Sequence, residues 1–430
     1  MTKPLKIGIA GLGTVGGGTL KILNEHAELL AARTGRPIVV SAISAKDRKK
    51  NRGVDISKIR WFENPLDMAA DADIDVVVEL IGGADGIAKT LVEKALENGK
   101  SVVTANKALI AHHGVTLAKI AEKNNKILAF EAAVAGGIPI IKALRDGLAA
   151  NQFKRVMGIL NGTCNYILTS MAETKRSFEE VLKEAQKLGY AEAEPSFDVD
   201  GIDTAHKLAI LTSLAYGSMP AIDKIMVEGI RHISLSDITF AAELGYVIKL
   251  LGIAAQTPQG IEQRVHPCLV KSHSPLGTVS GVYNAIFIEG DAVGNMFFEG
   301  RGAGAGPTAS SVVADIMDIA RGVNYKPFTL PVAELQQPNF SGIDNLRASY
   351  YLRLSVSDRP GVLAEVTAIF RQENISLQSF LQPSHHAGDV AQLVLTTHET
   401  GEAAMQRAIK TISALESIKE PPTMIRIENL

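Results

Sequence analysis

A glycine-rich turn lies directly between a short apolar run and a helical pattern at the start of the chain. Residues 6–10 have the composition of a buried strand, and Gly11, Gly13 and Gly16 follow them in a GxGxxG spacing. In such a turn the first glycine permits a tight bend, the second lets a pyrophosphate approach the backbone, and the third lets helix and strand pack closely. Free N–H groups at the helix start then face the phosphates. The pattern predicts a dinucleotide-binding fold; the alternative is a glycine turn that only packs.

Further β-rich runs alternate with helical patterns over the first third of the chain. They cover residues 38–43, 76–80, 101–104 and 127–130. Strands separated by helices of this length form parallel sheets with right-handed crossovers. We therefore expect a Rossmann-like, doubly wound parallel sheet over residues 1–146, with one helix running from the glycine turn to about Arg33. A glycine-dense segment over 301–322 is typical of a turn that feeds a helix, and we expect it to complete this domain.

The rest of the chain divides into an α+β domain, a linker and a small C-terminal module. Helical stretches at 177–188 and 202–215 mix with β-rich segments at 265–270 and 283–290, which predicts a substrate-binding and dimerisation domain over 147–300. Three prolines indicate a linker over 323–347. Residues 348–430 follow the order strand, helix, strand, strand, helix, strand, which is the ferredoxin-like βαββαβ module.

Charge and cysteine content exclude several classes of protein. The 430 residues carry 44 basic and 46 acidic side chains, so we expect no broad attraction to nucleic acid or to an anionic membrane. Cys164 and Cys268 cannot form a disulfide framework, which favours a reducing compartment. The first ten residues are too short for a secretory signal, and no run approaches the ~20 apolar residues of a membrane span. We expect a soluble, cytoplasmic protein.

The loop after the second strand bears on the choice of dinucleotide. Lys46 and Arg48 would favour the 2′-phosphate of NADP, and Asp47 comes a position or two late for the acid that holds the ribose of NAD. The alternative is an ordinary solvated charged loop. The sequence favours NADP, and NAD is not excluded.

The segment from residue 189 to 207 concentrates charge among apolar residues. If a helix begins near Asp200, Asp203 and Lys207 stand four residues apart on one face and could form a catalytic pair. Alternatively, Asp200 is an N-cap, Asp203 is the third-position acid of a capping arrangement, and Lys207 makes a surface ion pair of little value. The spacing alone leaves both interpretations open.

Two further clusters follow predicted strands. Lys107 comes just after the fourth strand, where loops face the ligand crevice, so it should point toward the nicotinamide half of a bound cofactor. The alternative is a solvent-exposed lysine at a helix start. Glu131 precedes a run of small residues whose carbonyls could coordinate a hard cation, although the same residues make an ordinary turn.

Taken together, these motifs resemble homoserine dehydrogenase in its single-function bacterial form with a C-terminal ACT domain. The resemblance covers essentially the whole chain in the same motif order. Its carriers are GLGTVG, TANKALI, EAAVAGGIPI, NGTCNYIL, GYAEAEPSFDVDGIDTAHK and GAGAGPTAS. One departure is Glu194, where the family usually has Asp, Asn or Ser before the proline.

The resemblance implies an NAD(P)-dependent interconversion of L-aspartate 4-semialdehyde and L-homoserine in threonine, methionine and isoleucine biosynthesis. It implies that Glu192 holds the substrate amino group, with Asp198 also in the substrate site, and that Asp203 orients the substrate. It assigns Lys207 as the proton donor to the carbonyl oxygen and places Lys107 between nicotinamide and substrate.

The resemblance also implies binding sites for the nucleotide and for a cation. Its nucleotide contacts correspond to Val15, Ala45 and Lys46, with Gly302 and Gly304 on the nicotinamide side. With the residues of the glycine turn and of the loops after the strands, the predicted cofactor contacts also include Gly11, Gly13, Thr14, Gly16, Arg48, Thr104 and Lys107. A monovalent cation, sodium in this family, corresponds to Glu131 with the carbonyls of Val134, Gly136 and Ile138.

The C-terminal module resembles an ACT domain at its first strand-to-helix turn, DRPGVL, around Gly361. Free N–H groups at that helix start could receive an amino-acid carboxylate. The resemblance implies L-threonine as effector, side-by-side pairing of ACT modules, and a homodimer or homotetramer; the alternative is a module that only dimerises. We expect His385 and His386, in a loop of this module, to be solvated and not metal ligands.

Two rival functions remain at this point. A semialdehyde dehydrogenase that works through a thioester would need a cysteine nucleophile, for which Cys164 is the candidate, although small-side-chain packing suits it better. A non-catalytic redox sensor would not need Lys107, Glu192, Asp203 and Lys207 together. Because the sequence starts at the cofactor loop, we expect no kinase fused before it.

Overall fold

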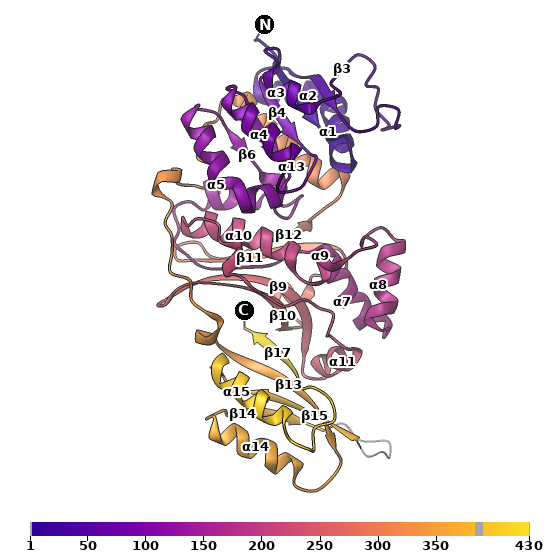
Figure 1. Ribbon diagram of the computed structural model, residues 1–430, viewed down its shortest axis with the longest axis vertical. Helices are drawn as coiled ribbons and strands as arrows, with labels where there is room; N and C mark the ends of the chain where they lie inside the picture. Colours follow the sequence, from indigo (N-terminus) through magenta and orange to yellow (C-terminus); the bar gives the residue numbers. More distant parts are fainter. Residues whose placement is uncertain (1, 383–389, 430) are drawn as a thin grey trace.

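In the computed structural model, residues 2–382 and 390–429 are described. The N-terminal parallel sheet, a large middle sheet and the C-terminal module follow one another along the longest axis (Figure 1). In those two ranges, no helix combines the length and apolar character needed to cross a membrane. His385 and His386 lie outside the described residues.

The N-terminal domain is the expected doubly wound parallel sheet. Its strand order is β3-β2-β1-β4-β5-β6, with every pairing parallel. The strands are β1 (Leu5–Ala10), β2 (Ile38–Ser44), β3 (Arg60–Trp61), β4 (Val76–Glu79), β5 (Ser101–Thr104) and β6 (Leu128–Ala129). The connecting helices are α3 (Pro65–Ala70), α4 (Ile87–Glu97) and α5 (Lys107–Lys123). This part of the fold prediction is confirmed.

The first crossover differs from its prediction. The single helix expected to run to about Arg33 is two helices, α1 (Thr14–Glu25) and α2 (Ala27–Thr34). His26 separates them, because its backbone leaves the helical region at φ −111° and ψ 18°. The sequence also did not predict β3, because two residues are too short to show a periodic pattern.

Helix α13 (Ala305–Arg321) returns from the middle domain and packs against α1. Val312 and Ile316 on this helix share a buried cluster with Ile7 and Ile9 of β1. Gly18 of α1 lies so close to the backbone of Ala305 that a Cβ there would overlap with the carbonyl oxygen. The contact brings the starts of α1 and α13 together.

The middle domain is built on long antiparallel strands. They are β7 (Phe153–Ile159), β9 (Tyr246–Thr257), β10 (Gly260–Lys271), β11 (Tyr283–Gly290) and β12 (Gly294–Arg301), with a short β8 (Met226–Val227) beside β10. The helices are α7 (Gly162–Thr174), α8 (Phe178–Lys187), α9 (Ser196–Val199), α10 (Ile202–Tyr216), α11 (Leu235–Glu243) and α12 (Pro275–Thr278). Helix α10 packs against both this sheet and α5, so it lies at the junction with the N-terminal domain.

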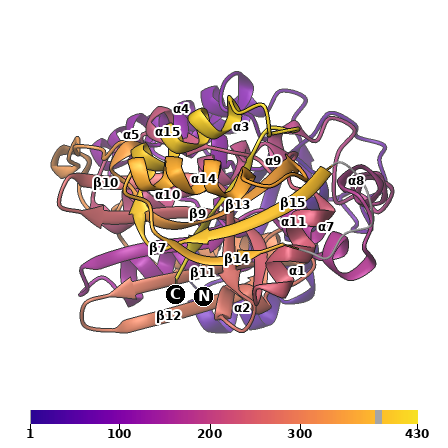
Figure 2. The same cartoon turned by 90° about the horizontal axis from the view of Figure 1, so that it is seen from below.

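The C-terminal module has the predicted βαββαβ order. It consists of β13 (Arg347–Ser357), α14 (Val362–Gln372), β14 (Leu377–Leu381), β15 (Val390–Thr397), α15 (Glu402–Ser413) and β17 (Thr423–Glu428), with a short β16 (Thr400–Gly401). Helices α14 and α15 lie on one face of these strands (Figure 2). Strand β17 pairs with β13 on one side and with β10 on the other, so the module and the middle domain share one continuous sheet. The sequence did not predict this junction.

The close packing of α1 on α13 predicts opposite effects for two adjacent glycines. Gly18→Ala should lower the free energy of unfolding by about 1–3 kcal/mol, because the methyl group meets the backbone of Ala305 and the helices must separate. A Cβ on Gly17 meets no described atom within 4 Å, so Gly17→Ala should be neutral or stabilise by about 0.5–1 kcal/mol. Urea unfolding of the two variants measures the difference; equal midpoints would contradict this packing argument.

Candidate active site

A pocket of about 460 Å³ lies where the N-terminal domain meets the middle domain. The starts of α5, α7, α10 and α13 surround it, and helix starts carry partial positive charge that favours bound anions. Its lining residues are Lys107, Asn161, Gly162, Thr163, Leu188, Gly189, Tyr190, Asp198, Asp203, Lys207, Val282, Asn284, Arg301, Gly302, Ala303 and Gly304. The structure thus brings together Lys107, Asp198, Asp203 and Lys207, four of the residues singled out from the sequence.

Asp203 is the centre of the polar contacts in this pocket. Its Oδ2 accepts a hydrogen bond from Lys207 Nζ at 2.7 Å, and its Oδ1 lies 3.0 Å from Lys107 Nζ. Lys207 Nζ also donates to the carbonyl oxygen of Leu160 at 2.6 Å. The side chains of Asp203 and Lys207 are only 5% and 11% exposed. One buried carboxylate therefore holds two ammonium groups at the pocket.

These contacts decide between the two interpretations of the spacing. Helix α10 begins at Ile202, with Gly201 as its N-cap in the left-handed region at φ 85°. Asp200 does not cap the helix; its carboxylate pairs with Arg231. The capping interpretation is therefore wrong, and so is the description of Lys207 as a surface ion pair.

Asn161 connects the two acids, and sequence reasoning gave it no role. Its Nδ2 donates to Asp198 Oδ1 and to Asp203 Oδ2, both at 2.8 Å, while its Oδ1 accepts from the backbone N–H of Cys164. Asn161 is the N-cap of α7, so the helix start fixes this side chain. The Asn-Gly-Thr sequence after a β run was the available signal.

The environment shifts the pKa values of the two acids in opposite directions. Burial alone would raise the pKa of Asp203, but the charges of Lys207 and Lys107 and the hydrogen bonds from Lys207 and Asn161 lower it well below its usual range. Burial raises the pKa of Asp198, and the hydrogen bond from Asn161 only partly opposes this. Asp203 is therefore a permanent carboxylate at neutral pH.

Glu192, a predicted substrate ligand, does not lie in the pocket with Asp198 and Asp203. It is exposed and is not among the lining residues of the pocket. Its backbone carbonyl accepts a hydrogen bond from Gln186 Nε2 at 3.0 Å. Tyr190, two residues earlier, does line the pocket, and its carbonyl accepts a hydrogen bond from Thr163 Oγ1. Glu192 thus lies two residues beyond the last residue of this segment that lines the pocket.

Cys164 is poorly suited to nucleophilic attack. It is fully buried, and its thiol donates a hydrogen bond to the carbonyl oxygen of Asp198 at 3.2 Å. Burial, together with the negative charges of Asp198 and Asp203, raises the pKa of the thiol well above its usual value. This geometry argues against the thioester rival and agrees with a packing role.

The glycine loop has the geometry that a pyrophosphate requires. Gly11 has φ 98° and lies against the backbone of Leu80, and Gly16 packs so closely on Gly11 that a Cβ at either position would overlap with main-chain atoms. A Cβ on Gly13 would meet no described atom within 4 Å, which leaves the loop open on that side. Gly13 is also the N-cap of α1 and has no side chain to cover the free N–H groups of Thr14 and Val15. The residues fit a dinucleotide.

A second pocket, of about 370 Å³, adjoins this loop. Gly13 and Thr14 line it together with Ala305, which follows Gly304 of the larger pocket. Consecutive residues at the start of α13 therefore line the two pockets, as an extended dinucleotide would require. The basic residues that line the smaller pocket are Lys21, Lys50 and Arg52, none of which the sequence argument assigned to the cofactor.

The predicted 2′-phosphate residues lie near this pocket without lining it. Ala45 follows β2, and Lys46 and Arg48 are exposed. The guanidinium of Arg48 lies 5.6 Å from the centroid of the Trp61 ring, and that of Arg52 lies 5.9 Å from the same ring. Both arginines of this loop therefore lie near the Trp61 ring, and the sequence spacing did not indicate these contacts.

The remaining predicted nucleotide contacts divide between the sheet and the large pocket. The hydroxyl of Thr104 donates to the buried carboxylate of Glu79 at 2.6 Å, so this side chain supports the strand ends. Gly302 and Gly304 line the pocket, and Gly302 lies directly against the side chain of Asn284. Gly304 has φ 123°, which requires glycine.

Glu131 is buried and lies at the start of a short helix. Its two carboxylate oxygens accept hydrogen bonds from the N–H groups of Ile141 and Lys142, at 2.9 and 2.8 Å. Its own N–H donates to Asp315. Burial and the neighbouring Asp315 raise the pKa of Glu131 to about 7. Lys142 Nζ lies 3.3 Å from Asp315 Oδ1, so one ammonium group already stabilises this pair of buried acids.

The other predicted cation ligands follow Glu131 in a buried loop. The carbonyl of Gly136 accepts a hydrogen bond from Ser311, and that of Ile138 accepts one from the N–H of Ile140. Val134 is fully buried in the same loop. Because a carbonyl oxygen has two lone pairs, these contacts leave it able to bind a hard cation as well.

The fold and the site define a class of enzyme. A glycine loop on a doubly wound sheet that opens onto a pocket with a buried aspartate and two lysines is the arrangement of an NAD(P)-dependent oxidoreductase. Family models agree: the homoserine dehydrogenase NAD-binding domain matches residues 11–131, homoserine dehydrogenase matches 139–317, and the ACT domain matches 350–417.

Known proteins are similar over most or all of the chain. A homoserine dehydrogenase of Neisseria gonorrhoeae is 47% identical over 434 residues, covering 100% of this chain and 99% of the relative. The crystal structure of a homoserine dehydrogenase from Thiobacillus denitrificans has a TM-score of 0.94 at 43% identity and covers 99% of both chains. A hyperthermophilic archaeal homoserine dehydrogenase in complex with NADPH has a TM-score of 0.65 at 27% identity, covering 75% of this chain and all of that one. The chain belongs to the homoserine dehydrogenase family.

A histidine beside the pocket predicts how stability depends on pH. His206 is 7% exposed, and its ring packs edge-on against Phe197 and His112. Burial, followed by the influence of His112 and Lys107, lowers the pKa of His206 from 6.5 to about 4. The unfolded chain therefore takes up a proton that the folded chain does not, and stability falls as the pH drops from about 6.5 toward 4.

Replacing this histidine should flatten that dependence. His206→Phe keeps an aromatic ring but removes the titratable imidazole. The fall in unfolding free energy from pH 7 to pH 4.5 should therefore be about 2–3 kcal/mol smaller in this variant than in wild type. Urea unfolding at a series of pH values measures it, with His232→Phe as the exposed control. Parallel pH curves for wild type and His206→Phe would contradict the assignment.

Proposed function

We propose that this chain interconverts L-aspartate 4-semialdehyde and L-homoserine with a nicotinamide dinucleotide. The observation that carries the proposal is the buried contact of Asp203 with Lys207 and Lys107, in a pocket whose lining residue Gly304 is followed directly by Ala305 of the glycine-loop pocket. Membership of the homoserine dehydrogenase family supports the substrate assignment.

The pocket supplies a proton and a stabilising charge. When bound, the reduced nicotinamide supplies a hydride to the aldehyde carbon of the substrate. Lys207 acts as the proton donor to the carbonyl oxygen, and its ammonium group stabilises the negative charge that grows there. Asp203 and the carbonyl of Leu160 hold that ammonium group in place, and Lys107 adds a second positive charge on the cofactor side.

Two further acids, Asp198 and Glu192, suit the substrate's amino group. Asp198 lines the pocket and is held by Asn161, which supports a contact with the substrate ammonium group. We assign Glu192 to the same group, from its place two residues beyond Tyr190 in the pocket wall. Asp203 orients both the lysines and the substrate.

We propose NADP as the preferred cofactor, with NAD also accepted. Lys21, Lys50 and Arg52 line the smaller pocket, and Lys46 and Arg48 lie in the adjoining loop, which concentrates positive charge for a 2′-phosphate. The archaeal relative bound to NADPH supports the same choice. We further propose a monovalent cation, sodium, at Glu131 with the carbonyls of Val134, Gly136 and Ile138; the burial of the Glu131 carboxylate beside this loop supports it.

The ACT domain suggests control by an amino acid. Gly361 has φ 95° and is the N-cap of α14, so the first N–H groups of that helix have no capping side chain. We propose that L-threonine binds there and inhibits, that the enzyme is a homodimer or homotetramer, and that it serves threonine, methionine and isoleucine biosynthesis. The free thiols of Cys164 and Cys268 support a cytoplasmic location.

Removing the donor lysine tests the chemistry. Lys207→Ala should lower kcat by at least about a hundredfold, since losing a charge-matched donor costs on the order of 3 kcal/mol, and should leave NADPH binding nearly unchanged. The exposed Lys154, which pairs with Glu289, provides the control substitution. Steady-state kinetics and a fluorescence titration with NADPH measure the two quantities. Strong residual turnover would remove Lys207 from the donor role.

One assay tests the cofactor and the regulation together. The full chain should oxidise homoserine with an absorbance rise at 340 nm, faster with NADP than with NAD and with sodium present. Added L-threonine should lower the rate, because carboxylate binding at α14 would favour an inactive state, whereas L-valine, which lacks the hydroxyl group, should not. No absorbance change with either cofactor would favour the sensor rival. An identical response to threonine and valine would contradict the effector assignment.

A further inference from the structure

An ion pair between buried Arg426 and partly exposed Glu228 joins the C-terminal module to the middle domain. Arg426 of β17 is 2% exposed and lies between two carboxylates. Its Nε and Nη2 donate to Glu402, the first residue of α15, at 2.9 and 2.6 Å. Its Nη1 donates to Glu228 of the middle domain at 2.9 Å. Arg426 therefore links a residue of the C-terminal module to a residue of the middle domain.

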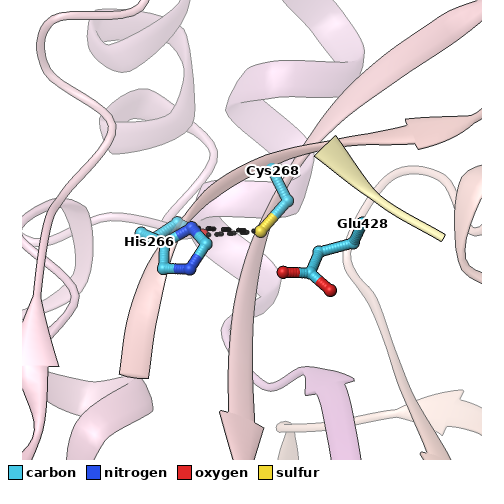
Figure 3. A group of neighbouring side chains, drawn as sticks. All are labelled: His266, Cys268 and Glu428. Atoms are coloured by element: carbon cyan, nitrogen blue, oxygen red, sulfur yellow. Dashed lines mark hydrogen bonds between the residues drawn. The ribbon is translucent and has the colours of Figure 1, made fainter. Parts of the chain in front are cut away.

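The neighbouring side chains fix this junction further. His266 and Cys268 of β10 and Glu428 of β17 lie side by side in the interior (Figure 3). Their types would suit a metal ion, but the carboxylate of Glu428 pairs with the buried guanidinium of Arg264, and Arg426 is also close enough to lower the pKa of His266. Two neighbouring positive charges disfavour a cation, so we interpret the group as a buried polar junction between β10 and β17.

Glu228 begins a segment that packs against the turn between Asp198 and Asp203. The next residue, Gly229, lies so close to Val199 and Asp200 that a Cβ would overlap with their main-chain atoms. The N–H of Ile230 donates to the carbonyl of Val199 at 2.8 Å. Residues 228–230 thus contact the backbone that connects Asp198 to Asp203.

Arg231 completes this contact. Its Nη2 donates to Ser196 Oγ at 2.7 Å and to Asp200 Oδ2 at 3.2 Å. Ser196 and Asp200 flank Asp198, which lines the pocket. We call residues 228–231 the clamp segment: one end pairs with Arg426, and the other holds both sides of the turn over 196–203.

We propose that Glu228 and Arg426 are positioning residues for the reaction: through their ion pair, the C-terminal strand holds the clamp segment, which places Asp198 and Asp203 at the pocket. The inference rests on the proposed function, because it concerns the positions of Asp198 and Asp203 in the active site proposed there. It also supplies a continuous series of contacts from α15 of the ACT domain to the pocket, by which an effector could change the rate.

The test compares the loss of the Glu228–Arg426 ion pair with the loss of another ion pair of the enzyme. Glu228→Ala removes the link to the clamp segment, while Arg426 keeps Glu402 as its partner. We expect kcat/KM for homoserine to fall about tenfold, with the KM for NADP unchanged, because misplaced groups lose rate without altering the separate nucleotide pocket. Glu373→Ala, which breaks the Glu373–Arg407 pair within the ACT domain, is the control and should stay within twofold of wild type.

A second variant removes the contacts between the clamp segment and the turn over 196–203. Arg231→Ala should give the same change in kcat/KM with an unchanged KM for NADP, and the double variant should be no more than about twofold worse than the stronger single variant, since both act through one segment. Circular dichroism melts show that each variant is folded at the assay temperature. Folded Glu228→Ala and Arg231→Ala enzymes with wild-type homoserine kinetics would overturn the positioning role. Absent homoserine turnover in wild type would instead refute the proposed function.

Discussion

The active site depends on one buried carboxylate that must remain charged. Asp203 has almost no contact with water, so its charge is tolerated only because Lys207, Lys107 and Asn161 surround it. Lys107 belongs to the N-terminal domain and Lys207 to the middle domain, so the same carboxylate draws the two domains together. The same ion pairs that arrange the pocket therefore also join the two domains, beside the packing of α10 on α5.

The cofactor side depends on close main-chain packing instead of charge. Gly11 and Gly16 are required because main-chain atoms occupy the space where a Cβ would lie, and Gly18 is required by the backbone of Ala305. This packing places the starts of α1 and α13 next to each other, with their uncapped N–H groups directed at one crevice. The segment that follows the middle domain thus contributes a helix to the N-terminal domain and to its dinucleotide site.

Much of this could be predicted from sequence, where the determinants are local. The glycine spacing, the alternation of strands and helices, the four-residue spacing of Asp203 and Lys207, and the position of Lys107 after a strand are all short-range patterns. The role of Asn161 was missed because its partners lie 37 and 42 residues away. Arg52 was missed because only the folded loop brings it beside the glycine turn. Spacing could not exclude the capping interpretation of Asp200, since the backbone angle of Gly201 decides it.

The insertion of β17 between β13 and β10 has a consequence for biosynthesis. Residues 272–422 separate β10 from the strand that covers its edge, so a ribosome adding roughly 5–20 residues per second needs about 8–30 s to supply the missing partner. During that interval the nascent chain carries an open sheet edge that is prone to pair with other polypeptides. The demand for chaperones should therefore be greatest while the ACT domain is being translated.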